Sequence, residues 1–351
     1  MPKIACLFAA CLLPCTAQWL TFKTPGIPRS ANGKPNLTAA APRVGDKPDL
    51  SGLWNMGVNL GYAANLTSDL GNGDIQPWAA DLSRRRLAEF GKDDPETVGC
   101  RAGGPRHITR PGIVRVIQSP TVIAILFEDL SFRQIFLDGR TLEKDPNPTW
   151  MGYSVGRWEG DTLVVETNGF NDRTWLDFAG HPHTEALRMT ERIRRADFGH
   201  LDIQVTLTDP GAYNKPWTVV SNGTFAADTE MIETVCSENE QDRSHLVGRT
   251  EAERQVKVAP EVLAKYAGTY VVQSSTVLDD RAPQTVFTVT AEGGDLYIDM
   301  AGKGRVLMTP LSQTSFSPRL LGTFDFVSDA SGKVTHMMVY SAEEALRAVK
   351  R

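Results

Sequence analysis

The chain of 351 residues has no surplus of positive charge. It carries 37 lysines and arginines against 42 aspartates and glutamates, which gives a formal net charge of -5. Because a protein that binds nucleic acid needs basic residues to neutralise the phosphates, we expect no nucleic-acid partner. With 41% hydrophobic and 23% charged residues the composition is that of a folded globular protein, which excludes disorder, collagen and coiled coil.

Sequence signatures of several common enzyme classes are also missing. The chain has no Gly-x-Ser-x-Gly elbow, no Ser-x-x-Lys pair, no phosphate-binding loop and no dinucleotide fingerprint. These absences disfavour chemistry with a serine nucleophile and chemistry that depends on NAD. No later segment approaches about 18 uninterrupted apolar residues, so no transmembrane segment is expected after the N-terminus.

Residues 1–17 have the pattern of a secretory signal peptide. Lys3 supplies a positive charge, residues 4–14 form an apolar run too short to span a bilayer, and residues 15–17 form a small-x-small cleavage site. We therefore expect a secreted or periplasmic protein. The alternative is a lipoprotein acylated at Cys11 or Cys15, but Pro14 suits an acylation site badly, and acylation at Cys11 would leave almost no apolar run.

Only Cys100 and Cys236 remain after removal of the signal peptide. Two lone cysteines in an oxidising compartment predict one disulfide, which would close a loop of more than a hundred residues. The alternative is a pair of buried thiols that behave as small hydrophobic groups. The bridge would bring the residues just after Cys100 toward the end of the last strand before position 237.

Periodicity and composition divide the rest of the chain into three parts. Residues 18–50 contain five prolines and predict an extended arm, residues 51–250 a β-barrel domain, and residues 251–351 a smaller C-terminal β-barrel. The expected fold is mainly β, with two antiparallel, lipocalin- or calycin-like barrels and one short helix at 76–90 in the first. Alternating residues predict the strands of the first barrel at Leu53-Trp54, 113–117, 121–127, 132–137, 151–158, 162–167, 186–195, 201–208, 217–225 and 230–236, and those of the second at 287–290, 296–300, 305–308, 323–327 and 334–340.

Hairpin connections sort the loops of the first barrel onto two ends. Glu159-Gly160 and Phe198-Gly199 are expected to form tight two-residue turns at one end. The longer connections, 138–150, 168–185 and 209–216, should then gather at the opposite end. Long loops inside a meander of strands are often functional, so we expect the functional site there.

His181, His183 and Glu185 alternate within the loop 168–185. In an extended backbone their side chains point the same way, as two imidazoles and a carboxylate that hold a divalent metal ion such as Zn²⁺ would. The motif is short, and hydrogen bonding of both histidines to loop backbone is the alternative. His200 belongs to the tight-turn end and is expected to be structural.

Other candidate residues come from the same loops and from the segment after Cys100. Asp177 or Asp209 could act as general base, and Tyr213 or Lys215 could stabilise developing charge. Trp150 and Trp175 could form an aromatic wall for a flat or apolar ligand. Arg173, Arg106 and His107 complete the predicted ligand-binding residues.

Several longer motifs resemble known proteins. The motifs are QWL at 18–20, TPGIPR at 24–29, KPDLSGLW at 47–54, PTWMG at 148–152, GRWEGDTLVVET at 156–167 and HPHTE at 181–185. Through these motifs, residues 18 to about 245 resemble a family of secreted bacterial proteins abundant in soil acidobacteria, for which no activity can be carried over. SGLW at 51–54 also resembles the Gly-x-Trp opening strand of lipocalin-type barrels. Residues 262–340 are similar to the small β-barrel appended to secreted beta-lactamase-like hydrolases, but the hydrolase domain is absent here.

Three functions remain open from the sequence. The first is a secreted barrel that binds a small apolar or aromatic ligand at its long-loop end. The second is a metal-assisted hydrolase or lyase that uses His181, His183 and Glu185. The third is an envelope-associated scaffold that uses both barrels for protein contacts.

Overall fold

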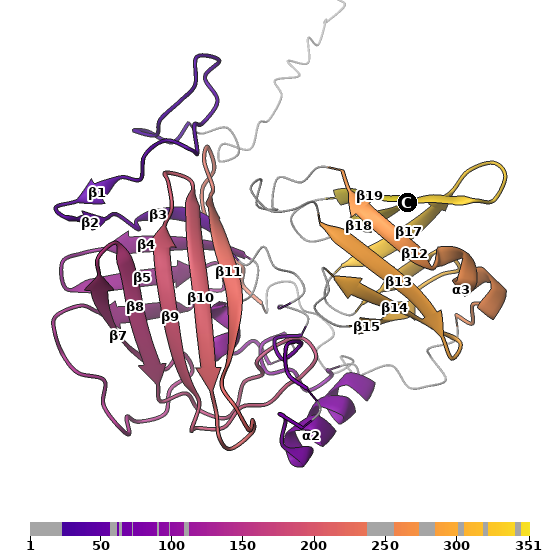
Figure 1. Ribbon diagram of the computed structural model, residues 1–351, viewed down its shortest axis with the longest axis horizontal. Helices are drawn as coiled ribbons and strands as arrows, with labels where there is room; N and C mark the ends of the chain where they lie inside the picture. Colours follow the sequence, from indigo (N-terminus) through magenta and orange to yellow (C-terminus); the bar gives the residue numbers. More distant parts are fainter. Residues whose placement is uncertain are drawn as a thin grey trace, which may run out of the picture.

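The computed structural model describes residues 23–56, 62, 65–71, 73–89, 91–97, 99–108, 112–236, 256–273, 285–300, 305–318, 322–340 and 345–351. Within these ranges the chain forms two closed β-barrels, one of nine and one of eight strands (Figure 1). The predicted mainly β fold with two barrels is confirmed. No helix in the described ranges is long and apolar enough to cross a membrane. The predicted signal peptide, 1–17, and the boundary near 250 lie outside the described residues.

The first barrel alternates buried and exposed side chains along most of its strands, as a closed sheet around an apolar core requires. Its strands are β3 (Gly52–Met56), β4 (Gly112–Gln118), β5 (Val122–Phe127), β6 (Phe132–Phe136), β7 (Tyr153–Glu159), β8 (Thr162–Asn168), β9 (Arg188–Arg195), β10 (His200–Thr208) and β11 (Trp217–Phe225). The predicted strand 230–236 does not form. Because β11 already pairs with β3 on one side and β10 on the other, no free edge is left for a further strand.

One strand pair departs from the antiparallel pattern. β6 and β7 are parallel, with Ile135 beside Ser154, so both strands end at the same end of the barrel. The connection between them must therefore run the length of the barrel. Residues 138–150 were predicted at the end with the other long loops, and the part from Glu143 on does lie there, because the carbonyls of Glu143 and Lys144 accept from Asn168 and Arg188. The connection begins at the opposite end, where the N–H of Leu137 donates to the carbonyl of Thr121.

Tight turns gather at one end of the first barrel, as predicted, but both turns differ in detail. In the β9–β10 connection the N–H of Ala196 donates to the carbonyl of His200, so residues 197–199 form the turn instead of Phe198-Gly199 alone. The β7–β8 turn is tight, but Gly160-Asp161 occupies it instead of Glu159-Gly160, because Gly160 has a φ of +62° that suits the first central position of such a turn. We call this the tight-turn end, and the opposite one the long-loop end. The long-loop end contains residues 169–187 and 209–216, the β5–β6 turn, and the 3₁₀ helix η1 (Gly104–Ile108).

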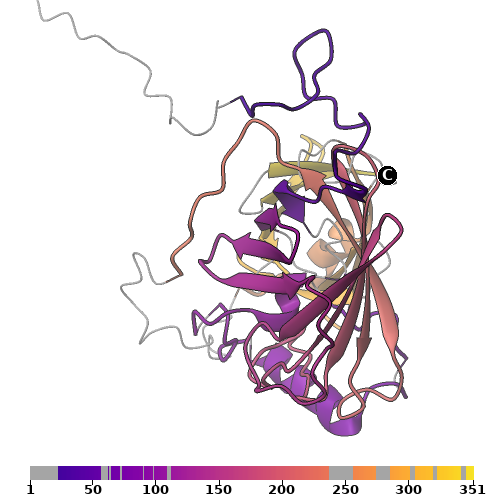
Figure 2. The same ribbon diagram turned by 90° about the vertical axis from the view of Figure 1, so that its left-hand side faces the viewer.

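Helix α2 (Pro77–Ala88) packs on the long-loop end, at the bottom of the first barrel in Figures 1 and 2. The helix predicted at 76–90 is thus found with slightly shorter bounds, and Pro77 begins it, where a missing N–H costs nothing. The Ser83 hydroxyl donates to the carbonyl of Ala179, and the Trp78 indole donates to that of Gly211. The helix therefore connects both long loops.

Residues 23–50 pack against the tight-turn end, at the top of the first barrel in Figure 1. Two short strands, β1 (Arg43–Val44) and β2 (Lys47–Pro48), pair within this segment. The backbone N–H groups of Phe198 and Gly199 donate to the carbonyls of Ala39 and Leu37, each at 2.7 Å. The segment predicted as an extended arm thus contains turns and a short hairpin, and it is attached to the barrel by backbone hydrogen bonds.

A stacked arginine closes the tight-turn end. The Arg195 guanidinium lies 4.7 Å from the centre of the Trp54 ring and donates to the carbonyls of Asp49 and Phe198. Burial lowers the pKa of Arg195 to about 10. His200 also lies at this end, where its Nδ1 is 2.6 Å from the Asp197 carboxylate, so a local structural role agrees with its position.

The second barrel has its own apolar core and one helix, α3 (Pro260–Tyr266), which was not predicted from the sequence. Tyr266 at the end of α3 stacks on Phe326 with ring centres 4.4 Å apart. The strands are β12 (Gly268–Val272), β13 (Val286–Glu292), β14 (Asp295–Met300), β15 (Arg305–Pro310), β16 (Ser315–Ser317), β17 (Thr323–Ser328), β18 (Val334–Tyr340) and β19 (Ala345–Lys350). Pairing of β12 with β19 closes this barrel.

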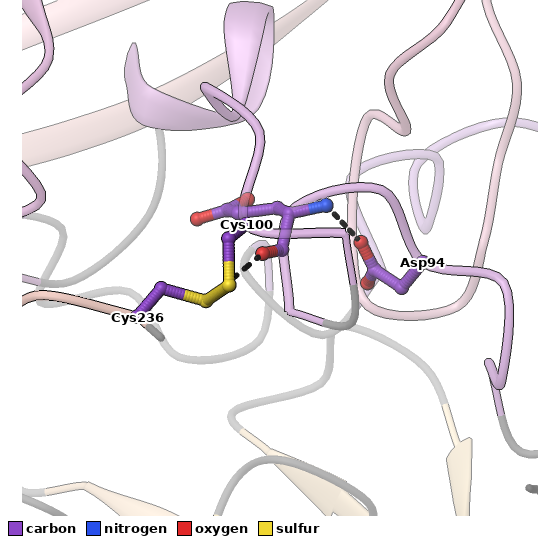
Figure 3. Close-up of a disulfide and its surroundings, with 4 residues drawn as sticks. Asp94, Cys100 and Cys236 are labelled. Carbon is purple, nitrogen blue, oxygen red and sulfur yellow. Dashed lines mark hydrogen bonds between the residues drawn. A yellow bond between two sulfur atoms is a disulfide. The ribbon is translucent and has the colours of Figure 1, made fainter. Parts of the chain in front are cut away.

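The predicted Cys100–Cys236 disulfide is present, with the two Cα atoms 5.6 Å apart (Figure 3). The Cys236 sulfur lies 3.9 Å from the carbonyl oxygen of Glu96, in the segment that precedes η1. The bridge therefore attaches the coil that follows β11 to the segment that leads into η1. It links two coil segments and involves no strand.

Replacing Cys100 and Cys236 by serine is expected to lower the free energy of unfolding by up to about 5 kcal/mol. The chain-entropy model assigns this value to a bridge that spans 136 residues. The strand signal in circular dichroism should persist in the folded variant. Urea denaturation measures the loss, with reduced wild type as matched control, and an unchanged midpoint in both samples would contradict the expectation.

Candidate functional site

Asp177 and His181 form a buried pair at the long-loop end. The Asp177 carboxylate is fully buried, lies 2.6 Å from Nδ1 of His181, and also accepts from the backbone N–H of His181 and of Leu66. Nε2 of His181 lies 3.0 Å from the Thr67 hydroxyl. Burial alone would raise the pKa of Asp177, but its attraction to His181 and these hydrogen bonds outweigh burial and lower it. The two predicted residues thus connect the loop 171–183 to the loop 65–70.

His183 lies in a separate buried position. Its Nε2 is 2.6 Å from the Thr174 hydroxyl, and Nδ1 faces the carbonyl of Thr184 at 3.3 Å. Burial lowers the pKa of His183 to about 4, so the imidazole is neutral at pH 7. A neutral imidazole can donate from one nitrogen only, which suits the carbonyl on one side and the hydroxyl on the other.

The predicted metal ligands are not brought together. Both ring nitrogens of His181 and of His183 face other partners, and Glu185 is exposed at the surface. The loop 181–185 is not a continuous strand, so the expected alternation of side chains does not hold. In the part of the chain that the structure describes, no three His, Cys, Asp or Glu side chains are grouped as metal ligands. A bound Zn²⁺ stays a prediction that this geometry does not support.

The other proposed catalytic residues also have structural partners. Asp209 is buried and accepts from the backbone N–H and the hydroxyl of Thr184, each at 2.6 Å. The Tyr213 hydroxyl donates to the carbonyl of Pro182 at 2.7 Å, and burial raises the pKa of Tyr213 well above 10. Lys215 is half exposed and pairs with Asp74 at 2.7 Å. Asp209 and Tyr213 therefore connect the 209–216 loop to the loop that carries the histidines.

Of the predicted aromatic wall, Trp175 is buried and Trp150 is half-buried. The Arg86 guanidinium lies 4.6 Å from the centre of the Trp175 ring, and burial lowers the pKa of Arg86 to about 10. Arg173 is exposed at the surface. Neither tryptophan is among the lining residues of the described cavities, and the aromatic wall of Trp150 and Trp175 stays a prediction.

Arg106 is buried in η1 among charged groups. Its guanidinium forms two hydrogen bonds with the Asp94 carboxylate, at 3.0 and 3.3 Å, and lies 3.2 Å from Glu96. It also lies 5.2 Å from the centre of the Phe178 ring. Asp94 lies close to the disulfide in Figure 3, and the carbonyl of Glu96 contacts the Cys236 sulfur. The ion pairs and the bridge thus position η1 together.

His107 faces the barrel interior beside Arg106. Its Nε2 lies 2.8 Å from Asp129 in the β5–β6 turn, and its ring packs edge-on against Phe127 at 4.5 Å. Burial alone would raise the pKa of Asp129, but the hydrogen bonds and charge of His107, together with Ser131, lower it below its usual range. The η1 segment is therefore held over the long-loop end of the barrel at this turn.

Gly104 explains how closely η1 approaches the long loops. Its φ is +62°, and a Cβ atom there would lie 2.8 Å from the hydroxyl of Thr174 and from the carbonyl of Trp150. A larger residue would force η1 away from the loop that carries His183.

Below η1 lies a cavity of about 50 Å³ in the barrel interior. Its lining is mostly aliphatic, with contributions from both barrel ends. The lining residues are Leu50, Met56, His107, Ile108, Val114, Val116, Ile123, Ile125, Phe127, Arg133, Ile135, Leu163, Glu191, Ile193, Leu201 and Ile203. Of the predicted ligand-binding residues, only His107 is among them.

Arg133 and Glu191 are functional candidates that were not predicted from the sequence. They form a buried ion pair across the interior, with two guanidinium nitrogens facing the two carboxylate oxygens. A sequence signal existed: Glu191 alternates with Met189 and Ile193, so strand periodicity places its charge on the apolar face. Charges on that face are normally retained only where a partner exists.

Comparison with protein-family models, with curated proteins and with solved structures gives no match. The resemblance to secreted acidobacterial proteins therefore stays an expectation from the motifs. A functional conclusion for this chain must come from the geometry of the first barrel and its cavity.

Replacing Asp177 by asparagine is expected to destabilise the protein by about 3 kcal/mol at pH 7, because His181 then loses a buried charged partner. The matched control is Asp161→Asn, which removes an exposed, solvent-screened pair with Arg43 and should change the stability far less. Since the pKa of Asp177 is lowered by folding, its contribution should be present above about pH 4 and disappear at lower pH. Urea denaturation across pH tests this, and equal effects of both substitutions at pH 7 would refute it.

We expect a second pH dependence of stability from His183. Its pKa falls from about 6.5 in the unfolded chain to about 4 in the folded one, so the neutral form stabilises the fold above pH 6.5 and this stabilisation is lost toward pH 4. Between pH 7.5 and 4.5 wild type should lose about 2 to 3 kcal/mol more than His183→Gln. Thr174→Val keeps the imidazole and should retain the wild-type pH dependence, whereas identical slopes in wild type and His183→Gln would argue against the assignment.

Proposed function

We propose that the first barrel binds a small apolar molecule in the cavity below η1, entered from the long-loop end. The observation that carries this proposal is the interior cavity of about 50 Å³ with its aliphatic lining. Binding sites for small molecules are typically concave and mostly apolar, with a few placed polar groups. In this cavity the polar groups are His107, Arg133 and Glu191.

The chemistry of the two barrel ends favours entry at the long-loop end. At the tight-turn end, Arg195 and Trp54 stack and are bonded to backbone carbonyls. At the long-loop end, the cavity is bounded by side chains of a short 3₁₀ helix, which is held by contacts between side chains and by the disulfide. Moving η1 would break fewer backbone hydrogen bonds than separating the barrel strands would.

The size of the cavity limits the ligand. A cavity that holds benzene is about 150 Å³, so an aromatic ligand would require η1 to move outward, whereas a molecule of a few heavy atoms would not. The disulfide and the predicted signal peptide support action in an oxidising, secreted or periplasmic location.

Xenon tests the proposal because it enters dry apolar cavities of this kind. Crystals of wild type under xenon pressure should show one site bounded by Val116 and Ile203. Val116→Phe places a ring inside the cavity and should abolish this site. Val220→Phe, on the exposed face of β11, is the matched control and should keep it. Absence of xenon from wild type, or its retention in Val116→Phe, would overturn the proposal.

A further inference from the structure

Four polar side chains lie together on the inner face of the first barrel. Arg133, Ser154, Thr167 and Glu191 come from four neighbouring strands, β6 to β9, and each is at most 3% exposed. The first and last of them line the cavity. A buried ion pair of this kind contributes little to stability compared with apolar side chains of the same volume, so its presence beside a cavity points to another role.

The hydrogen bonds of this group can be counted. The guanidinium of Arg133 has five N–H groups. Nε donates to Ser154 at 3.1 Å, Nη1 donates to Glu191 at 3.0 Å, and Nη2 donates both to Thr167 at 2.8 Å and to Glu191. The hydroxyls of Ser154 and Thr167 lie 2.9 Å apart, so one of them donates to the other.

Two hydrogens remain without an acceptor in this group. One is the second N–H of Nη1, and the other belongs to whichever of the two hydroxyls accepts the bond between them. Among the residues that the structure describes, no acceptor for either hydrogen is found within hydrogen-bond distance. Of the two, only the Arg133 donor belongs to a residue that lines the cavity. A buried donor without an acceptor is costly, so this N–H favours an additional oxygen acceptor in the cavity.

The charge of the group restricts what that acceptor can be. Arg133 and Glu191 neutralise each other, so a ligand carboxylate would add an unpaired negative charge to a buried site beside Glu191. An ammonium group would be repelled by Arg133 in the same way. A carbonyl or hydroxyl oxygen on an uncharged molecule accepts from Arg133 without this penalty.

We infer that the ligand of the first barrel is an uncharged molecule with an apolar body and one carbonyl or hydroxyl oxygen, which accepts a hydrogen bond from Arg133. The inference rests on the proposed binding function. It excludes both a pure hydrocarbon and a fatty-acid carboxylate as the preferred class of ligand.

Acetone and acetate test this inference, because they have nearly the same shape and differ in charge. Titration of wild type at pH 7, followed by NMR of the Arg133 side chain, should give a dissociation constant for acetone at least tenfold below that for acetate. The double variant Arg133→Met, Glu191→Met should lose acetone affinity at least tenfold and still bind xenon. The matched control, Arg157→Met with Glu166→Met, removes an exposed pair on β7 and β8 and should keep the preference.

The outcomes separate this inference from the binding function. If wild type binds xenon but binds acetone no more tightly than acetate, the inference is wrong and the binding function stands. If wild type binds neither xenon nor acetone, both are wrong. The comparison of acetone with acetate in wild type needs no variant, so it decides the matter even where the interior double variant does not fold.

Discussion

The first barrel depends on one constraint: each charge that its closure buries must have a partner. Three arginines meet this constraint at three levels of the barrel. Arg195 at the tight-turn end is bonded to backbone carbonyls, Arg133 in the interior to Glu191, and Arg106 at the long-loop end to Asp94 and Glu96. Because burial penalises an unpaired charge far more than it rewards a pair, loss of a partner at any level is costly.

The partners of the buried charges differ between the two ends of the barrel, and the two ends therefore respond differently to solution conditions. Backbone carbonyls do not titrate, so the contacts of Arg195 do not depend on the protonation of a partner. The long-loop end relies on carboxylates, imidazoles and a disulfide, which respond to acid and to reductant. Contacts that can change with conditions are thus concentrated at the end where η1 borders the cavity.

Periodicity alone was enough to predict most strands of the first barrel, because a half-buried strand must alternate apolar and polar residues. It failed at 230–236, where alternation is present but the closed sheet leaves no pairing edge, and it could not show that β6 and β7 are parallel. The pairing direction depends on the end at which the chain re-enters the sheet. The local sequence of residues 137–152 does not show which end that is. The disulfide was predictable because only Cys100 and Cys236 remained as a pair.

The candidate site was predicted less well, because residue type does not reveal which partner a polar group has found. His181, His183, Asp209 and Tyr213 do gather at one end of the barrel, but they bond to loop backbone, hydroxyls and each other. Polar groups used in this way hold loops in place and have little capacity left for a ligand. Arg133 lies on the predicted strand β6, and among the described residues one N–H of its guanidinium has no acceptor beside the apolar cavity. We therefore propose the binding site where hydrogen-bonding capacity is unused beside the cavity, and not where polar residues are most dense.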